Sequence, residues 1–310
     1  MGFLEKKIKQ HIWLPYRCSK ISKKMSSLNV LDSLETLDYL LSSNSSIIRF
    51  GDGDMDLLTG TREEGYQNGS ELLRVKMEEA LTNQQSGLLV CIPSVMVNYS
   101  NIGLYTDRAQ YHFRTILIRF HQFVLEKLTS DRVYGDAQLT RPYMDTLNRE
   151  FSKKIFLGFK KLFSVDTLIL VEGEKTRFAV GNDLFDGAKR VIRVEAPAVN
   201  AFDKYEEILE KIKEIALEQR KNRPLENIMF VLALGPTAKL LTLDLVKLGY
   251  RAIDVGHLDI EYEWFLRGAT KKISIPGKYV NEAKDGKVWS ENSDLNLEQY
   301  EKEIVARVGI

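Results

Sequence analysis

Apolar residues recur along this chain with two different spacings, and the two alternate. A spacing of three or four residues predicts helices, whereas short continuous apolar runs predict strands buried on both faces. The predicted helices cover residues 32–41, 70–82, 111–128, 144–156, 205–220 and 236–248, with a short helical turn at 182–185. The predicted strands cover 47–50, 88–92, 132–134, 167–171, 190–194, 227–234 and 251–255. This alternation indicates an α/β fold with a mostly parallel sheet flanked by helices.

The pattern changes at both ends of the chain. Residues 1–30 form a basic N-terminal segment, and residues 269–310 form a polar, less periodic C-terminal extension that wraps the domain or continues toward a partner. No linker rich in Pro, Gly or Ser divides residues 31–268, so we predict one domain there.

Composition limits the classes of function and the compartment. The 310 residues are 44% apolar and 28% charged, which is typical of a globular protein, and the net charge of +1 gives no indication of a nucleic-acid partner. The two cysteines, Cys18 and Cys91, favour a reducing compartment, so we expect a cytoplasmic protein. No apolar run approaches the roughly 20 residues that cross a bilayer.

The basic segment has two interpretations. Residues 1–24 carry seven Lys or Arg and one Glu, interspersed with apolar residues that include Trp13. Such a segment can lie on an anionic membrane, here the inner face of the cell membrane. The alternative is a solvated helix that packs on the domain. A homo-oligomer is compatible with this sequence but is not specified by it.

Asp52 and Asp54 lie in the sequence Arg49-Phe-Gly-Asp-Gly-Asp, directly after a predicted strand. A turn through the two glycines can aim both carboxylates into one site. Hard oxygen ligands suit Mg²⁺ or Mn²⁺, ions that keep several waters and bind substrate phosphates. The alternative is a tight turn without function, because Asp-Gly pairs commonly form turns.

Polar segments follow six of the seven predicted strands. Ligands of parallel α/β sheets bind beyond the carboxyl ends of the strands, so these residues are expected to gather at one edge. This gathering is the main reason to predict an active site. The segments are 51–54, 93–98 with Asn98, 135–143 with Arg141, 172–177 with Lys175 and Arg177, 235–237, and 256–263 with His257, Asp259, Glu261 and Glu263.

Two of these segments predict specific chemistry. Gly235-Pro236-Thr237 begins a helix, and the free N–H groups of a helix start attract anions, although a plain capping turn is the alternative. His257, followed by alternating acids, can complete a metal site or act as a general base, the alternative being a hydrogen-bonded core histidine. Arg141, Lys175 and Arg177 can each neutralise a diphosphate or pair with a neighbouring acid.

Several enzyme classes lose support. The chain has no GxSxG, no Cys/His pairing, no GxGxxG and no Walker motif. A carboxylate-bound divalent cation near anion-binding turns remains, which fits phosphate-containing substrates. The two reactions that fit are transfer from a nucleotide-activated donor and hydrolysis of a phosphate ester. A non-catalytic module that binds nucleotide sugars is a third possibility.

Four separated motifs resemble one known family, the GT-D type glycosyltransferases, first named domain of unknown function 1792. The similarity extends from about residue 32 to about residue 268, in the family's order. The motifs are Arg49–Asp54, Gly135–Tyr143, Val171–Phe178 with Gly181–Phe185, and Ala233–Ala238 with Asp254–Trp264.

The resemblance implies a Rossmann-like single catalytic domain. It also implies a UDP-sugar donor, a cation such as Mn²⁺, and a glycan or glycoprotein-linked acceptor in the synthesis of bacterial surface polysaccharide or glycoprotein. The family's metal motif is Asp-x-Glu. Here Asp52 and Asp54 occupy it, so the second acid is one methylene shorter.

On this basis we expect a metal site, a donor site and a base. Asp52 and Asp54 would hold the cation, with His257 as third ligand or as a donor to the diphosphate. If the enzyme is inverting, Glu261 is the first candidate for the base and Asp259 the second. The residues expected to bind the donor are Arg49, Asp52, Asn98, Arg141, Lys175, Arg177, Gly235, Pro236 and Thr237.

Overall fold

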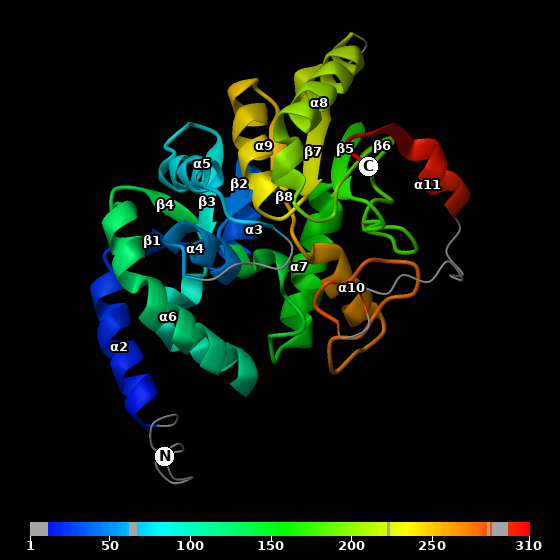
Figure 1. Ribbon diagram of the computed structural model, residues 1–310. Coiled ribbons are helices and arrows are strands. Elements are labelled where there is room, and N and C mark those ends of the chain that lie inside the picture. The colour runs from blue at the N-terminus through cyan, green and yellow to red at the C-terminus, as the bar shows by residue number, and fades with distance from the viewer. Residues whose placement is uncertain (1–11, 62–66, 222–223, 284–285, 287–296) are drawn as a thin grey trace.

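The computed structural model describes residues 12–61, 67–221, 224–283, 286 and 297–310. In this part of the chain a nine-stranded sheet forms the centre, with helices on both sides (Figure 1). The strand order is β1-β4-β3-β2-β8-β7-β5-β6-β9, and every pair of neighbours is parallel. The strands are β1 (Asn29–Val30), β2 (Ser46–Arg49), β3 (Leu88–Ile92), β4 (Val133–Asp136), β5 (Thr167–Gly173), β6 (Val191–Ala196), β7 (Ile228–Ala233), β8 (Arg251–Asp254) and β9 (Ile304–Arg307). The predicted parallel α/β fold is therefore confirmed.

The helices bury two separate apolar clusters, one on each face of the sheet. On one face lie α2 (Leu14–Met25), α4 (Asp52–Thr59), α5 (Glu71–Thr82), α6 (Asp107–Lys127), α8 (Tyr205–Arg220) and α9 (Pro236–Lys247). On the other face lie α3 (Ser33–Ser42), α7 (Arg149–Leu162) and α10 (Leu258–Leu266). The side chains of β3 alternate between the clusters, Val90 facing one and Leu89 the other, as the two-residue period of a strand requires. None of the described helices has the length and apolar character that spanning a membrane demands.

Helix boundaries follow local capping chemistry. Asp32 caps α3 in a reciprocal capping box with Glu35, and the Ser70 hydroxyl accepts the N–H of Leu73 at the start of α5. Helix α6 begins about one turn before the predicted position 111, because Thr106 caps it by accepting the N–H of Ala109. The apolar periodicity located the buried face of α6, and the cap determined where the helix begins.

Four local predictions were wrong. Strand β4 continues through Asp136, and β5 continues through Glu172 to Gly173, where loops were expected. A Cβ added at Gly135 would lie 2.6 Å from Sγ of Cys91, so glycine at this position allows close strand packing. Helix α7 begins at Arg149 rather than at residue 144, and residues 182–185 form turns and bends without a helix.

Both ends of the described chain contact the central layers. Helix α2 packs along α6, whereas residues 1–11 of the predicted basic segment lie outside the described residues. From the C-terminal segment, α11 (Leu297–Glu303) leads into β9, which pairs with β6. The sheet therefore extends beyond the boundary predicted at residue 268.

Candidate active site

A cavity of about 390 Å³ lies at the carboxyl ends of the strands. It receives residues from the segments that follow β2, β4, β5, β7 and β8, and from the first turns of α6. Of the predicted site residues, the cavity wall contains Arg49, Asp52, Asp54, Arg141, Gly235, His257 and Asp259. The expected gathering of polar segments at one sheet edge is thus what the structure shows for these seven.

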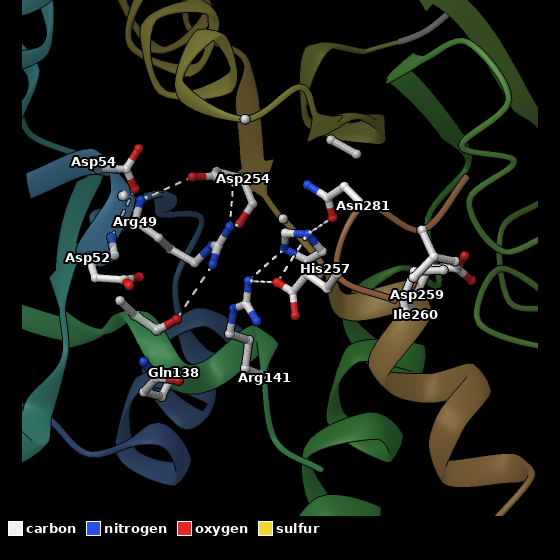
Figure 2. Close-up of a pocket in the computed structure, with 18 of the residues that line it drawn as sticks. Arg49, Asp52, Asp54, Gln138, Arg141, Asp254, His257, Asp259, Ile260 and Asn281 are labelled. Atoms are coloured by element: carbon white, nitrogen blue, oxygen red, sulfur yellow. Dashed lines mark hydrogen bonds and ion pairs between the residues drawn. The ribbon is translucent and has the colours of Figure 1, made fainter. Parts of the chain in front are cut away.

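The Gly51–Asp54 sequence starts a helix rather than forming an isolated turn. Gly51 is the N-cap of α4, and its N–H donates to Oδ2 of Asp54 at 2.9 Å. Asp54 is the N3 residue, and it accepts this N–H as the N3 acid of a capping box does. Asp52 and Asp54 therefore occupy positions i and i+2 of a helix, which do not face each other. The two carboxylates both line the cavity but diverge, as Figure 2 shows.

Asp54 is directed toward a buried lysine that the sequence analysis did not select. Nζ of Lys239 lies 2.9 Å from Oδ1 of Asp54 and 3.7 Å from Oδ2 of Asp254. The side chain of Lys239 is only 4% exposed, and it lines the cavity from α9. Both oxygens of Asp54 are therefore already bound, one by the ammonium group and one by the N–H of Gly51.

Arg49 joins the ends of β2 and β8. Its Nη2 donates to Oδ1 of Asp254 at 2.8 Å, its Nε donates to the backbone oxygen of Asp254, and its own N–H donates to Oδ2 of that residue (Figure 2). Burial would raise the pKa of Asp254, but Arg49 and Lys239 outweigh it and lower that pKa. Gly256 has φ +47°, and a Cβ there would lie 2.1 Å from Nη2 of Arg49, so only glycine leaves room for the guanidinium group.

Asp52 offers its carboxylate to the cavity. Its side chain is 47% exposed, and its Oδ2 lies 3.3 Å from Nε2 of His112 on α6. Burial opposes ionisation, but the hydrogen bond and charge of His112, together with the charge of Arg141, lower the pKa of Asp52 to about 2. Asp52 is therefore ionised at neutral pH.

A second polar cluster of the cavity wall consists of Arg141, His257, Asn281 and Glu282. Figure 2 shows Arg141, His257 and Asn281 apart from Asp52 and Asp54. Nη2 of Arg141 lies 2.9 Å from Nδ1 of His257 and also donates to Oε1 of Glu282. Because a guanidinium group only donates, Nδ1 of His257 must accept, which places the proton of the neutral ring on Nε2. That Nε2–H donates to Oδ1 of Asn281 at 3.0 Å.

These contacts keep the imidazole neutral. Burial and the charge of Arg141 lower the pKa of His257 to about 4, although Glu282 acts in the opposite direction. Both ring nitrogens are hydrogen-bonded, so His257 could bind a cation only by giving up Arg141 or Asn281. The arrangement makes His257 a residue that orients Arg141, which differs from the expected role of metal ligand.

The helix start at Gly235-Pro236-Thr237 reaches the cavity through Gly235, which has φ +53°. Pro236 occupies the first turn of α9, as predicted, and is buried. Thr237 is fully buried, and its hydroxyl oxygen has no hydrogen-bond partner among the residues that the structure describes. The side chain that this helix contributes to the cavity is Lys239, one half-turn further on.

The remaining predicted residues do not line the cavity. Glu261 is fully buried, and its Oε2 accepts the N–H groups of Tyr143 and Met144 at 2.9 and 2.8 Å, so it fixes the backbone that follows Arg141. Burial raises the pKa of Glu261 to about 7. The other three are Asn98, whose amide donates to the carbonyl of Val30, Lys175, which is exposed, and Arg177, whose Nη1 donates to the carbonyl of Gly277.

Asp259 lines the cavity but its carboxylate is bound on the inside. Nζ of Lys278 lies 2.8 Å from Oδ2 and 3.0 Å from Oδ1, and Asn182 and the N–H of Ala179 donate to Oδ1 as well. Burial is the largest effect on Asp259 and raises its pKa. Asp259, the second candidate for the base, is therefore held in a buried ion pair with Lys278.

The donor set limits how a divalent cation can be held. Within the described residues no group of three or more His, Cys, Asp or Glu side chains is arranged to hold a metal ion. Asp52 is ionised and half exposed, with His112 3.3 Å from its Oδ2, whereas Asp54, Asp254 and His257 make shorter contacts with their protein partners. The site fits an ion bound by one protein carboxylate together with waters and substrate phosphates, a mode that Mg²⁺ commonly uses.

Sequence reasoning missed several cavity residues. Lys239 carried a recognisable signal, because it is a lone charge in the apolar stretch Ala238-Lys-Leu-Leu241. His112 carried no such signal, because no acidic residue lies close to it in sequence on the helix. Asn281 and Glu282 lie in the aperiodic region after residue 268, where no local pattern marks a functional residue.

Comparison with known proteins identifies the family. A model described as "Glycosyltransferase GT-D fold" matches residues 47–283. A probable glycosyl transferase Gly of Streptococcus gordonii is 35% identical over 287 residues, which is 91% of this chain and 39% of that protein. Glycosyltransferase GlyD of Streptococcus pneumoniae is 31% identical over 93% of this chain and 33% of that protein. The chain thus spans 39% and 33% of the lengths of these two relatives.

Solved structures agree with the family model. One, described as a domain of unknown function 1792 with a distinct glycosyltransferase fold, is 35% identical with a TM-score of 0.81, covering 94% of this chain and all of that one. Another, a glycosyltransferase of the same domain type from Streptococcus sanguinis, is 36% identical with a TM-score of 0.78, covering 90% of this chain and 99% of that one. The matched residues and the shared fold show that the chain belongs to the glycosyltransferase family with the GT-D fold.

Proposed function

We propose that this chain transfers a sugar from a UDP-sugar to a glycan or a glycoprotein-linked sugar in the synthesis of a bacterial surface polysaccharide or glycoprotein. The observation that carries the proposal is the cavity itself, where Arg49, Lys239 and Arg141 converge with the ionised Asp52. When a sugar departs from a nucleoside diphosphate, negative charge grows on the diphosphate. Cationic groups held in place around that charge stabilise the transition state.

Lys239 and Arg141 are the proposed diphosphate-binding cations. Each is held by carboxylates of the protein, Lys239 by Asp54 and Asp254 and Arg141 by Glu282. An ammonium group has three donors and a guanidinium group has five, so both retain capacity for phosphate oxygens. Their existing ion pairs fix them before the donor arrives, which lowers the entropic cost of binding.

His257 is the proposed positioning residue for Arg141. As a neutral acceptor it holds one nitrogen of the guanidinium group, and it is itself held by Asn281. Glu261 fixes the segment that follows Arg141, because its carboxylate accepts the N–H groups of residues 143 and 144. We therefore propose a structural role for Glu261 in place of the role of general base.

Asp52 is the proposed protein ligand of a divalent cation, Mn²⁺ or Mg²⁺. Such a cation would act as a Lewis acid on the diphosphate oxygens. Asp54 contributes indirectly, because it fixes both the start of α4 and the ammonium group of Lys239. A single carboxylate predicts weak binding of the ion alone and much tighter binding in the presence of UDP.

The experiment that tests this function is an assay of UDP release. The protein is incubated with a panel of UDP-sugars and Mn²⁺, with and without glycan acceptors. Release that requires an acceptor supports sugar transfer. Equal release without any acceptor would identify a phosphohydrolase, and tight UDP binding without turnover across the panel would identify a binding module.

We also propose a cytoplasmic location. Cys18 and Cys91 are free thiols, and both are buried. Burial raises the pKa of the Cys18 thiol to about 11, so it stays protonated and unreactive at neutral pH. Labelling of the intact cell from outside with an impermeant amine reagent should leave the protein unmodified, whereas the same reagent should modify it in lysed cells.

A further inference from the structure

The outward face of helix α2 combines aromatic and basic side chains. Trp13 at the N-cap, the adjacent pair Tyr16 and Arg17, then Lys20 and Lys24 recur every three or four residues, so they share one side of the helix. Their side is the exposed one: Trp13 is 45% exposed and Tyr16 is 60% exposed. Ile12, directly before them, is 65% exposed.

The opposite side of α2 is fixed to the domain. Cys18, Ile21 and Met25 are buried in the core cluster that also contains α6. The Ser22 hydroxyl donates to the carbonyl of Val97 at 2.7 Å, and Sγ of Cys18 contacts the carbonyl of Arg114 on α6. Figure 1 shows α2 along α6 at the margin of the molecule. Residues 14–25 of the basic segment therefore form a helix that packs on the domain, and this packing holds the aromatic and basic side chains outward.

The charge of this face is entirely positive. Helix α2 carries Arg17, Lys20, Lys23 and Lys24 and no acidic residue. In the described parts of the chain, none of these four forms an ion pair with a carboxylate. Instead, Arg17 lies 5.1 Å from the ring centre of Trp13, and Lys20 lies 4.6 Å from that of Tyr16. The net charge of the whole chain is only +1, so this is a local concentration of charge.

These features match an anionic bilayer surface. Trp and Tyr rings occupy the headgroup level of membranes, and Lys and Arg near them attract anionic lipid headgroups. Interfacial helices combine basic side chains with Trp and other apolar side chains. In α2 the apolar side packs on the domain, so the basic and aromatic side chains of its exposed side would make the contact with the bilayer. The exposed face is a stripe along a helix rather than a pocket, which suits a continuous surface better than a single ligand.

We propose that the outward face of α2 docks this protein on a membrane surface rich in anionic phospholipid. Its basic side chains contact headgroup phosphates, and Trp13, Tyr16 and Ile12 enter the headgroup layer. The proposal does not depend on the proposed sugar transfer. In this orientation only α2 would separate α6 from the bilayer, and Arg108 and His112 of α6 line the cavity.

The test is co-sedimentation of the full chain with phosphatidylcholine vesicles that contain or lack phosphatidylglycerol. The wild type should sediment with the anionic vesicles and stay in solution with the neutral ones. The double variant Lys20→Glu, Lys24→Glu should lose at least about tenfold in binding to anionic vesicles. The matched control is Lys211→Glu, Lys213→Glu on α8, which changes the net charge equally and should bind like the wild type.

A second variant tests the aromatic contribution. Trp13→Ala should weaken binding several-fold and should abolish the quenching of tryptophan fluorescence by brominated lipid, while the circular dichroism spectrum stays unchanged. Equal sedimentation with both kinds of vesicle, or wild-type binding by the Lys20→Glu, Lys24→Glu variant, would overturn the proposal. Binding of equal strength to soluble polyglutamate, unaffected by Trp13→Ala, would overturn it too and would identify a site for acidic polypeptides.

Discussion

Two buried lysines, Lys239 and Lys278, each lie between two carboxylates, but one lines the cavity and the other is enclosed by the protein. Lys239 pairs with Asp54 and Asp254 and lines the cavity. Lys278 pairs with Asp259 and Glu263, and its side chain is completely buried. We call them the open cluster and the sealed cluster.

Each cluster has a further arginine, so their charges balance alike. Arg49 binds Asp254 in the open cluster, and Arg267 binds Glu263 in the sealed cluster. The difference is in the acids. The pKa of Asp254 is lowered by its two cations, whereas burial raises the pKa of Asp259. The open cluster keeps its charges available to a ligand, and the sealed cluster uses them to attach residues 275–283 to α10.

The sealed cluster should give the largest effect on stability. Lys278→Met leaves two buried acids without their ammonium group, and breaking a buried ion pair typically costs about 3–5 kcal/mol. We expect a loss of that size in the free energy of unfolding, measured by urea denaturation. Lys271→Met, at an exposed position nearby, should change it by less than about 0.5 kcal/mol. If Lys278→Met lowered the free energy of unfolding by less than about 1 kcal/mol, the two acids would be stable without the ammonium group.

His257 lies between the clusters in sequence and should give the next largest effect. Its pKa is about 4 in the folded protein and about 6.5 in an unfolded chain, so the unfolded state takes up the proton first as pH falls. The free energy of unfolding should therefore fall by up to about 3 kcal/mol between pH 6.5 and pH 4. His257→Gln should flatten this part of the profile, measured by urea denaturation at several pH values. His121→Gln on α6 serves as control, and an unchanged slope in His257→Gln would show that other groups cause it.

Lys239→Met should weaken the binding of UDP. Hydrogen bonds to charged groups contribute about 1.5–3 kcal/mol, so UDP affinity should fall roughly 10- to 150-fold. Calorimetric titration with UDP and Mn²⁺ measures this change. Lys247→Met, on the same helix but 54% exposed, should bind like the wild type. Full UDP affinity in Lys239→Met would remove the distinction between the open and sealed clusters.

Asp52→Asn should give the smallest effect on stability and the most specific effect on the cation. The side chain is half exposed, so the free energy of unfolding should change by less than about 0.5 kcal/mol. The gain in UDP affinity that Mn²⁺ provides should disappear. Asp54→Asn should instead lower stability by about 1 kcal/mol, because it weakens the start of α4. If only Asp54→Asn removed the Mn²⁺ effect, the metal ligand would have to be reassigned.

The cavity could be predicted in part because strand ends are visible in the sequence. Strand β3 and helix α8 begin and end where the apolar pattern placed them. The residues that follow the strands then had to meet at one edge, and Arg49, Asp52, Asp54, Arg141 and His257 do meet there. The pattern could not show which way each side chain points within its segment.

Asp52 and Asp54 illustrate that limit. In an extended turn they could share one ion, whereas in the first turn of α4 they diverge. The choice depends on the capping bond from Gly51 and on the ammonium group of Lys239, which arrives from a distant helix. Glu261 and Asp259 were similar cases, since their partners at residues 143, 144 and 278 are invisible in local sequence.

The sequence by itself determined the parallel α/β architecture, the order of the strands along the chain and the family, because these follow from short-range periodicity and from sequence motifs. The tertiary structure decided which charges are paired and which stay available. Ion pairs such as that of Arg49 with Asp254, 205 residues apart, form only when the sheet brings strand ends together. Their strength depends on burial, which is a property of the packed molecule and not of any segment.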